Sequence, residues 1–346
     1  MPVKSYAAMS AGAPLVPFSF ERCDPGPRDV AIEILYCGIC HSDIHSVRDE
    51  WGRGHYPMVP GHEIVGRVSR IGKDVLRFKP GNLVGVGCFV DSCRSCPPCK
   101  DGQENYCEHG PLFTYNAADK NGEHTRGGYS SHIVVDEHYV LRIPNSLAAD
   151  RAAPLLCAGI TTYSPLKHWK IGRGHRLGVV GLGGLGHMAV KLGVAFGADV
   201  AVLSTSPGKR ADALGLGAKD FVLTTDHAEL GKREGRFDFI VNTVSASHNM
   251  DALLNLLRRD GTMILVGAPG EPVPFSPFSL IMARKNMAGS LIGGIKETQE
   301  MLDYCAKEAV LPEVEVLPVS RVNEAYERVL RGDVRYRFVL DMKTLP

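Results

Sequence analysis

The 346-residue chain has no uninterrupted apolar run that reaches the ~18 residues needed for a membrane-spanning helix. Its amino terminus has no apolar segment of the length found in secretory signal peptides. It also lacks an excess of charge of either sign, because 39 lysines and arginines offset 38 acidic residues to a formal net charge of +1. These absences give no reason to expect a membrane or a nucleic acid as a partner, and they favour a cytoplasmic protein.

The composition is that of an ordinary globular chain. A hydrophobic fraction of 44% and a charged fraction of 22% are typical of an enzyme with large buried cores. The length predicts about two domains. Ten cysteines in a chain without an export signal favour metal ligation over disulfide bonds.

The first part of the chain is predicted to be a β-rich domain. Short apolar runs, separated by turns that carry glycine and proline, are typical of a barrel-like, mostly antiparallel sheet. These runs occupy residues 30–36, 64–68, 83–86 and 133–135. The character of the sequence changes near Ala148, so we place the end of this domain at residue 150.

Residues 151–290 are predicted to form a second domain of alternating strands and helices. A helical stretch at 151–168 leads into it. Strand-like runs then alternate with helix-like segments such as 188–196 and 252–258, which predicts a parallel, doubly wound sheet. The strand-like runs are 177–180, 200–203, 221–223, 237–241 and 262–266.

The tail of the chain is expected to return to the first domain. It contains amphipathic helical patterns at 299–306 and 323–330 and a short apolar strand at 337–340. We therefore assign residues 291–346 to the same domain as residues 1–150.

A glycine-rich turn connects the strand at 177–180 to the helix after it. Gly181, Gly183 and Gly186 match the G-x-G-x-x-G pattern in the strand–turn–helix context that makes it specific. These glycines permit the tight turn, the approach of a pyrophosphate and close helix–strand packing, and the helix amino terminus offers free N–H groups. A merely flexible loop is the alternative interpretation. The predicted dinucleotide site comprises Gly181, Leu182, Gly183, Gly184, Leu185 and Gly186.

The second strand of this domain ends without an acidic residue. An enzyme that uses NAD usually places Asp or Glu there to bind the adenosine ribose 2′-OH. Hydroxyls and cations follow instead, and these groups bind a 2′-phosphate through charge-assisted hydrogen bonds. We therefore predict that the cofactor is NADP(H). The alternative is that the two cations only solvate the start of a helix. The residues concerned are Ser204, Thr205, Ser206, Lys209 and Arg210.

Four cysteines lie close together in one irregular loop. Cys93, Cys96, Cys99 and Cys107 offer four thiolates, which suit a closed tetrahedral Zn²⁺ site that fixes the loop. Iron–sulfur ligation is a competing interpretation, but the rest of the chain offers no electron-transfer partner.

A second group of ligand-type residues combines Cys40, His62 and the distant Cys157. A catalytic zinc needs three protein ligands and one exchangeable position, and two cysteines with one histidine form such a set. Glu63 is suited to occupy the fourth position transiently, and Asp43 to orient His62. Each of these residues alone also has a structural interpretation, as a buried thiol or a core histidine; their combination favours a metal site.

The chain resembles the zinc-dependent medium-chain alcohol dehydrogenases, and within them the cinnamyl alcohol dehydrogenase-like branch. The resemblance covers essentially the whole length. It rests on residues 38–45 (GICHSDIH), 56–63 (YPMVPGHE), the four-cysteine loop, 127–129 (GGY), 157–163 (CAGITTY) and 181–187. It implies a GroES-like β-barrel catalytic domain and a Rossmann domain that binds NADP(H).

The resemblance also implies a role for individual residues. Cys40, His62 and Cys157 would hold a catalytic zinc with Glu63 as alternate ligand, at a cleft between the domains, and the four-cysteine loop would hold a structural zinc. A proton would pass from the substrate oxygen through the Ser42 hydroxyl and the nicotinamide ribose to His45, whose alternative role is that of a surface histidine. Further cofactor-lining positions are Ser42, Thr161, Thr243, Gly267, Ser290, Leu291 and Ile292.

The expected reaction is hydride transfer between NADP(H) and a primary alcohol or aldehyde. Apolar side chains that would line the substrate pocket favour an aromatic or medium-length aliphatic aldehyde. They are Trp51, Met58, Leu112, Phe113, Tyr115 and Leu291. The resemblance further implies a homodimer joined through the sheets of the nucleotide domains.

Three other functions remain open at this stage. Some relatives of this branch reduce a conjugated C=C bond, although the intact Cys40, His62 and Cys157 set argues for carbonyl chemistry. A zinc-stabilised module would bind NADPH without turnover. A redox-sensing thiol protein would need reactive cysteines rather than ligated ones.

Overall fold

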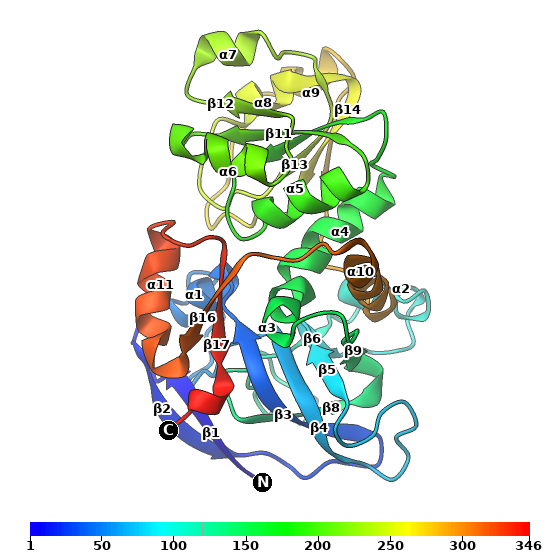
Figure 1. The fold of residues 1–346 in the computed structure, drawn as a ribbon, viewed down its shortest axis with the longest axis vertical. Coiled ribbons are helices and arrows are strands. Elements are labelled where there is room, and N and C mark those ends of the chain that lie inside the picture. The colour runs from blue at the N-terminus through cyan, green and yellow to red at the C-terminus, as the bar shows by residue number, and fades with distance from the viewer. Residues whose placement is uncertain (120) are drawn as a thin grey trace. The chain divides into compact units, whose positions relative to one another are not determined.

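The computed structural model describes residues 1–119 and 121–346, and the chain divides into two compact units. The first unit comprises Met1–Ile160 and Ile292–Pro346, and the second comprises Thr161–Leu291 (Figure 1). The first break lies inside helix α4 (Ala158–His168), whereas the change in sequence character lies near residue 150. Among the described residues, no helix combines the length and the apolar character needed to cross a membrane.

The first unit is built on a seven-stranded sheet in the order β16-β17-β3-β4-β5-β9, with β8 paired to β3. All of these pairs are antiparallel except β16–β17, so the mostly antiparallel sheet expected from the sequence is confirmed. The central strand β3 is almost entirely buried because it has neighbours on both edges. The bounds are β3 (Asp29–Gly38), β4 (Ile64–Ile71), β5 (Leu83–Val86), β8 (His132–Asp136), β9 (Leu141–Arg142), β16 (Val314–Pro318) and β17 (Arg337–Asp341).

Two two-stranded sheets and several helices complete this unit. Helix α11 is amphipathic: Val322, Ala325 and Tyr326 are buried at the spacing of one helical face. The two-stranded sheets pair β1 (Pro2–Ala8) with β2 (Leu15–Glu21), and β6 (Phe89–Asp91) with β7 (Leu112–Phe113). The helices are α1 (His41–Val47), α2 (Pro97–Lys100), α3 (Ala149–Ala152), α10 (Ile295–Glu308) and α11 (Val322–Leu330).

The second unit contains a six-stranded, all-parallel sheet in the order β12-β11-β10-β13-β14-β15. This confirms the parallel sheet that alternating strand and helix patterns predict. The strands are β10 (Arg176–Val180), β11 (Asp199–Ser204), β12 (Asp220–Leu223), β13 (Phe237–Asn242), β14 (Leu257–Leu265) and β15 (Asn286–Gly289). The helices are α4, α5 (Gly186–Ala195), α6 (Arg210–Gly215), α7 (His227–Gly231), α8 (Met250–Leu256) and α9 (Phe278–Ile281).

One predicted boundary in this unit is wrong. The helix expected at 252–258 is α8, which ends at Leu256, and Arg258 already belongs to β14. The strand begins early because Leu257 pairs with Phe237 before a register shift in the β13–β14 ladder. Pairing with a distant strand therefore overrides the local helical pattern.

Candidate active site

Four potential metal ligands from distant parts of the sequence meet in the first unit. The donor atoms of Cys40, His62, Glu63 and Cys157 all lie within 4.8 Å of one another, and all four side chains are buried. Cys40 follows β3 as the N-cap of α1, His62 and Glu63 directly precede β4, and Cys157 follows a short 3-10 turn. The antiparallel pairing of β3 with β4 brings the first three together.

The spacing of these sulfur atoms fits a metal ion rather than a disulfide. Cys40 Sγ and Cys157 Sγ are 3.8 Å apart. Two thiolates bound to one tetrahedral zinc at about 2.3 Å each would be separated by about 3.8 Å, whereas a disulfide bond is about 2.05 Å long. All ten cysteines are free thiols. The donor set therefore fits zinc, with three protein ligands and Glu63 beside them.

The pKa values of the two thiols are shifted in opposite directions. The hydrogen bond from Cys157 lowers the pKa of Cys40 well below its ordinary value although burial opposes this, and His62 and Arg337 act in the same direction. The same hydrogen bond raises the pKa of Cys157, with further contributions from Cys88 and from burial. These contacts favour the thiolate form of Cys40, which is the form that binds a metal ion.

The carboxylate of Asp43 lies beside the imidazole of His62. Its side chain is fully buried, and Oδ1 lies 3.3 Å from His62 Nδ1. Its carboxylate also accepts hydrogen bonds from Cys40 N at 2.9 Å, Gly61 N at 3.2 Å and the hydroxyl of Tyr129 at 3.2 Å. This arrangement fixes the orientation of the ring and leaves Nε2 available to a metal ion.

The partner of Glu63 was not predicted from the sequence. Arg337, at the start of β17, forms a buried ion pair with Glu63 Oε1, while Glu63 Oε2 has no hydrogen-bond partner among the described residues. Burial raises the pKa of Glu63 to about 7 although Arg337 opposes this shift. Gly38 makes room for the carboxylate, because a Cβ there would lie 1.9 Å from Oε2. The sequence signals for this ion pair were a cation, Arg337, in a short apolar strand and a glycine, Gly38, at the end of another strand.

The two residues of the expected proton relay lie on α1. The Ser42 hydroxyl donates a hydrogen bond to Cys40 Sγ at 3.1 Å, which places it beside the metal ligands. His45 Nδ1 pairs with Glu50, a partner that the sequence did not reveal, and its Nε2 is buried without a partner in residues 1–119 and 121–346.

The residues predicted to line the substrate pocket differ in burial and in their contacts with the other site residues. Tyr115 is buried and stacks on the His62 ring at 5.7 Å, and Trp51 lies 5.1 Å from the His45 ring. Met58 is fully buried and bridges to Ala8. Leu112 and Phe113 form β7, and the Phe113 side chain is exposed. Tyr115 is therefore the candidate in closest contact with the metal ligands.

The four-cysteine loop forms a second ligand cluster. The sulfur atoms of Cys93, Cys96, Cys99 and Cys107 lie within 4.8 Å of one another, with Cys93–Cys99 at 3.9 Å and Cys96–Cys107 at 4.0 Å. These separations again match two thiolates on one tetrahedral zinc. Backbone N–H groups of residues 93 and 96 donate to sulfur atoms of the cluster, which stabilises thiolates.

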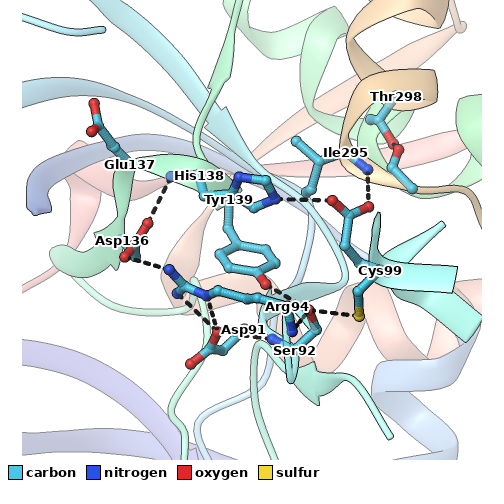
Figure 2. A network of polar contacts seen from close by, with 12 residues as sticks. Asp91, Ser92, Arg94, Cys99, Asp136, Glu137, His138, Tyr139, Ile295 and Thr298 are labelled. Atoms are coloured by element: carbon cyan, nitrogen blue, oxygen red, sulfur yellow. Dashed lines mark hydrogen bonds and ion pairs between the residues drawn. The ribbon is translucent and has the colours of Figure 1, made fainter. Parts of the chain in front are cut away.

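A polar network anchors this loop to the β-sheet (Figure 2). Arg94, which has a φ of 59°, binds Asp91 and Asp136 at 2.9 Å each and covers the buried ring of Tyr139. Ser92 links the ring to the cluster, since its Oγ lies 2.8 Å from the Tyr139 hydroxyl and accepts from Cys99 Sγ at 3.2 Å. The loop is thus fixed both by its thiols and by the ion pair of Arg94 with Asp136, the last residue of β8.

Glu104 extends this network to helix α10. The buried carboxylate accepts a hydrogen bond from Ile295 N at 3.0 Å and contacts His138 Nε2 at 2.9 Å. The N-cap residue of α10 is Gly294, which has no side chain to cap the helix. Burial would raise the pKa of Glu104, but hydrogen bonds from His138 and the backbone lower it. Glu104 therefore caps α10 from a distant loop.

Replacing Glu104 by alanine is expected to lower the free energy of unfolding by about 2–3 kcal/mol, because a buried N–H loses its charged acceptor. Hydrogen exchange should accelerate in α10 in particular. Glu108→Ala, an exposed carboxylate of the same loop, serves as control. The measurement is urea unfolding with zinc at saturation, combined with exchange mass spectrometry. Unchanged protection of α10 would contradict this role.

The glycine turn of the second unit has the geometry expected of a dinucleotide loop. Gly181 has a φ of 86°, which other residues rarely adopt. A Cβ on Gly186 would lie 2.1 Å from Gly181 O, whereas a Cβ on Gly183 would meet no atom within 4 Å. The first and last glycines are therefore required by the turn itself, and the space beside Gly183 is open for a phosphate.

The structure separates the two cations of the predicted 2′-phosphate loop. Lys209 Nζ donates to Leu182 O of the glycine turn at 2.9 Å, so its charge lies at the dinucleotide loop. The guanidinium of Arg210 instead stacks on Phe221 at 4.9 Å and approaches Glu229 at 3.8 Å. Ser204 ends β11 and is buried, while Thr205 and Ser206 are exposed. Lys209 is the better candidate for a phosphate ligand.

The remaining cofactor positions occupy different surroundings. Thr243 Oγ1 donates to Val180 O at 2.7 Å beside the glycine turn. Thr161 is buried in α4, Gly267 follows β14, and Ser290 N donates to Leu265 O at 3.1 Å. Leu291 is exposed at the end of the second unit, and Ile292 begins the last part of the first unit.

Two family models match the chain. The alcohol dehydrogenase GroES-like domain matches residues 26–145, and the zinc-binding dehydrogenase domain matches residues 184–307. An NADP-dependent alcohol dehydrogenase C of Mycobacterium tuberculosis is 56% identical over 343 residues, which cover 99% of each chain. An aldehyde reductase of Escherichia coli is 56% identical over 352 residues, which cover 100% of this chain and 99% of the relative.

Solved structures agree with these sequence matches. A cinnamyl alcohol dehydrogenase from Sorghum bicolor superposes with a TM-score of 0.98 at 46% identity, covering 100% of this chain and 99% of the other. A cinnamyl alcohol dehydrogenase from Helicobacter pylori, complexed with NADP(H), superposes with a TM-score of 0.94 at 44% identity, covering 99% of both chains.

Proposed function

Because the chain belongs to the zinc-dependent medium-chain alcohol dehydrogenase family, in its cinnamyl alcohol dehydrogenase-like branch, we propose that it interconverts primary alcohols and aldehydes with NADP(H). The observation that carries this proposal is the buried Cys40, His62 and Cys157 set with Glu63 beside it. We assign the metal chemistry to the first unit and cofactor binding to the glycine turn of the second. The four-cysteine cluster holds a second, structural zinc.

The bound zinc supplies a Lewis acid for the substrate oxygen, and NADP(H) supplies or accepts the hydride. The protein residues prepare the site for both. Asp43 keeps His62 in the tautomer that leaves Nε2 free, and Arg337 holds the carboxylate of Glu63. Tyr115 forms an apolar wall against His62, which favours aromatic or medium-length aliphatic aldehydes as substrates.

The proposal is tested by NADPH oxidation with aromatic and aliphatic aldehydes, with zinc quantified in the same sample. We expect two zinc ions per chain, turnover of aromatic aldehydes and the alcohol as the first product from cinnamaldehyde. The saturated aldehyde as first product would instead assign reduction of the conjugated C=C bond. NADPH binding without turnover of any aldehyde would indicate a non-catalytic module that binds NADPH.

His45 and Ser42 are proposed to carry the proton between the substrate oxygen and water. His45→Gln is expected to lower the rate of alcohol oxidation near neutral pH by up to about 10²-fold and to alter the pH–rate profile, because the outer proton acceptor is lost. His41→Gln is the matched control, since its ring lies 4.8 Å from that of His45 but is exposed. An unchanged profile in His45→Gln removes it from the relay.

Lys209 is proposed to select NADP(H) by binding the 2′-phosphate. Lys209→Gln is expected to raise the KM for NADPH by about 10- to 100-fold, the effect of one charged hydrogen bond, and to leave the KM for NADH nearly unchanged. Arg210→Gln is the control, because its guanidinium is engaged with Phe221. Steady-state kinetics with both cofactors, and competition by 2′-phospho-ADP-ribose, measure the effect. Equal losses with NADPH and NADH would exclude a 2′-phosphate contact.

A homodimer joined through the second unit is part of the same proposal. Strand β15 lies at the edge of the six-stranded sheet. Nearby in sequence, Phe278, Ile281 and Met282 are 68%, 67% and 78% exposed. Open strand edges and exposed apolar patches favour association. Light scattering should find a dimer that Ile281→Asp disrupts and that Leu76→Asp, at an exposed site of the other unit, leaves intact.

A further inference from the structure

A basic hollow lies at the amino ends of four adjacent strands of the second unit. Its volume is about 280 Å³. The strand order places the first residues of β12, β11, β10 and β13 side by side along it. The lining residues are Arg176, Asp199, Val200, Ala201, Lys219, Asp220, Lys232, Arg233, Arg236 and Phe237.

The charge of this hollow is unbalanced although the whole chain is nearly neutral. Five cations and two carboxylates line it. The complete sequence, by comparison, has 39 lysines and arginines and 38 acidic residues. Asp199 is paired with Lys219, and Asp220 with Arg233 at 2.9 Å. No carboxylate within residues 1–119 and 121–346 forms an ion pair with the side chain of Arg176, Lys232 or Arg236. Three uncompensated cations therefore face one small volume.

The backbone that carries the two unpaired arginines is fixed by the fold. Arg176 N donates to Asp238 Oδ2 at 2.7 Å, and Asp238 is itself paired with Arg258 at 2.7 Å. Arg236 N donates to Leu256 O at 2.9 Å. The two guanidinium groups consequently project from anchored positions at strand ends, which lowers the entropic cost of binding a ligand.

We propose that this hollow is a second anion site, which binds a small ligand carrying phosphate groups. Guanidinium groups present planar, forked donors that match phosphate oxygens, and three of the lining residues are arginines. The site is separate from the dinucleotide loop, because the glycine turn follows the carboxyl end of β10 and Arg176 begins that strand. Along five residues of strand, the two ends are about 13 Å apart.

The test is calorimetric titration of the zinc-loaded protein with inorganic triphosphate. Saturating NADPH is present throughout, so that the protein groups that bind the phosphates of the cofactor are already occupied. We expect one triphosphate per chain. The double variant Arg176→Gln/Arg236→Gln should weaken binding about tenfold or more, since two charged donors are lost. Its affinity for NADPH should be unchanged, which shows that the domain is folded.

The matched control is Arg259→Gln/Arg284→Gln, which removes the same charge from exposed positions outside the hollow. Triphosphate affinity should survive in this variant. The proposal is overturned if triphosphate does not bind, if both double variants lose affinity equally, or if citrate binds as tightly as triphosphate. It is also overturned if polyglutamate binds and triphosphate does not, because the surface would then recognise an acidic macromolecule.

Discussion

Replacing Cys157 by serine is expected to remove one of the two zinc ions. The same substitution should lower kcat/KM for aldehyde reduction by at least about 10³-fold. The serine hydroxyl keeps the size of the side chain but does not ionise as a thiol does, so the third metal ligand is lost. Loss of a Lewis acid worth several kcal/mol corresponds to a rate effect of at least about this size. Metal analysis and steady-state kinetics on the same preparation measure both quantities.

Cys88 provides the matched control for this substitution. Its thiol contacts Leu156 O at 3.7 Å and the side chain of Cys157, but it lies outside the group of four donors. Cys88→Ser should therefore retain both zinc ions and most of the activity. Cys107→Ser should lose the other zinc ion and destabilise the four-cysteine loop. If Cys157→Ser retains both zinc ions with normal turnover, the assignment of the catalytic ligands is wrong.

The same preparations separate ligated from redox-active cysteines. Thiolates bound to zinc react slowly with thiol reagents until the metal is removed. We expect the six cysteines of the two predicted zinc sites to become reactive only after chelation. Rapid reaction of Cys40 and Cys157 before chelation would favour a thiol sensor instead.

The sequence predicted those parts of the site that depend on local patterns. Cys40, Asp43 and His62 lie in short motifs at the ends of β3 and β4, and the antiparallel pairing of these strands brings them together. The glycine turn was equally readable, because its spacing, the strand before it and the helix after it all belong to one continuous segment.

The contacts that were missed depend on pairing between distant strands. Arg337 reaches Glu63 across a separation of 274 residues because β17 pairs with β3. Both strands are mostly buried, so neither shows the alternation of apolar and polar residues that would specify the register of the pairing. Lys209 and Arg210 are adjacent in sequence, yet their side chains diverge because Phe221 of the next strand binds one of them. Such charges are visible in the sequence, but their partners depend on the tertiary structure.

Arg337→Met is expected to destabilise the metal-free protein by about 3–5 kcal/mol, because removal of one partner leaves the other charge buried without compensation. Both side chains are buried, and Glu63 Oε2 already lacks a partner among the described residues. The double variant Glu63→Gln/Arg337→Met removes the stranded charge and should recover much of this loss. Arg337→Lys, which keeps the charge without the forked geometry, should give an intermediate value.

Unfolding by urea with and without bound zinc distinguishes this pair from an ordinary structural ion pair. In Arg337→Met the released carboxylate of Glu63 gains freedom to approach the metal as its fourth ligand, so zinc should offset part of the destabilisation. The loss in free energy of unfolding should therefore be smaller with zinc than without it, and kcat should fall because the exchangeable position is occupied. Equal losses in both states, with unchanged kcat, would show that Arg337 supports the fold and does not hold Glu63 away from the metal.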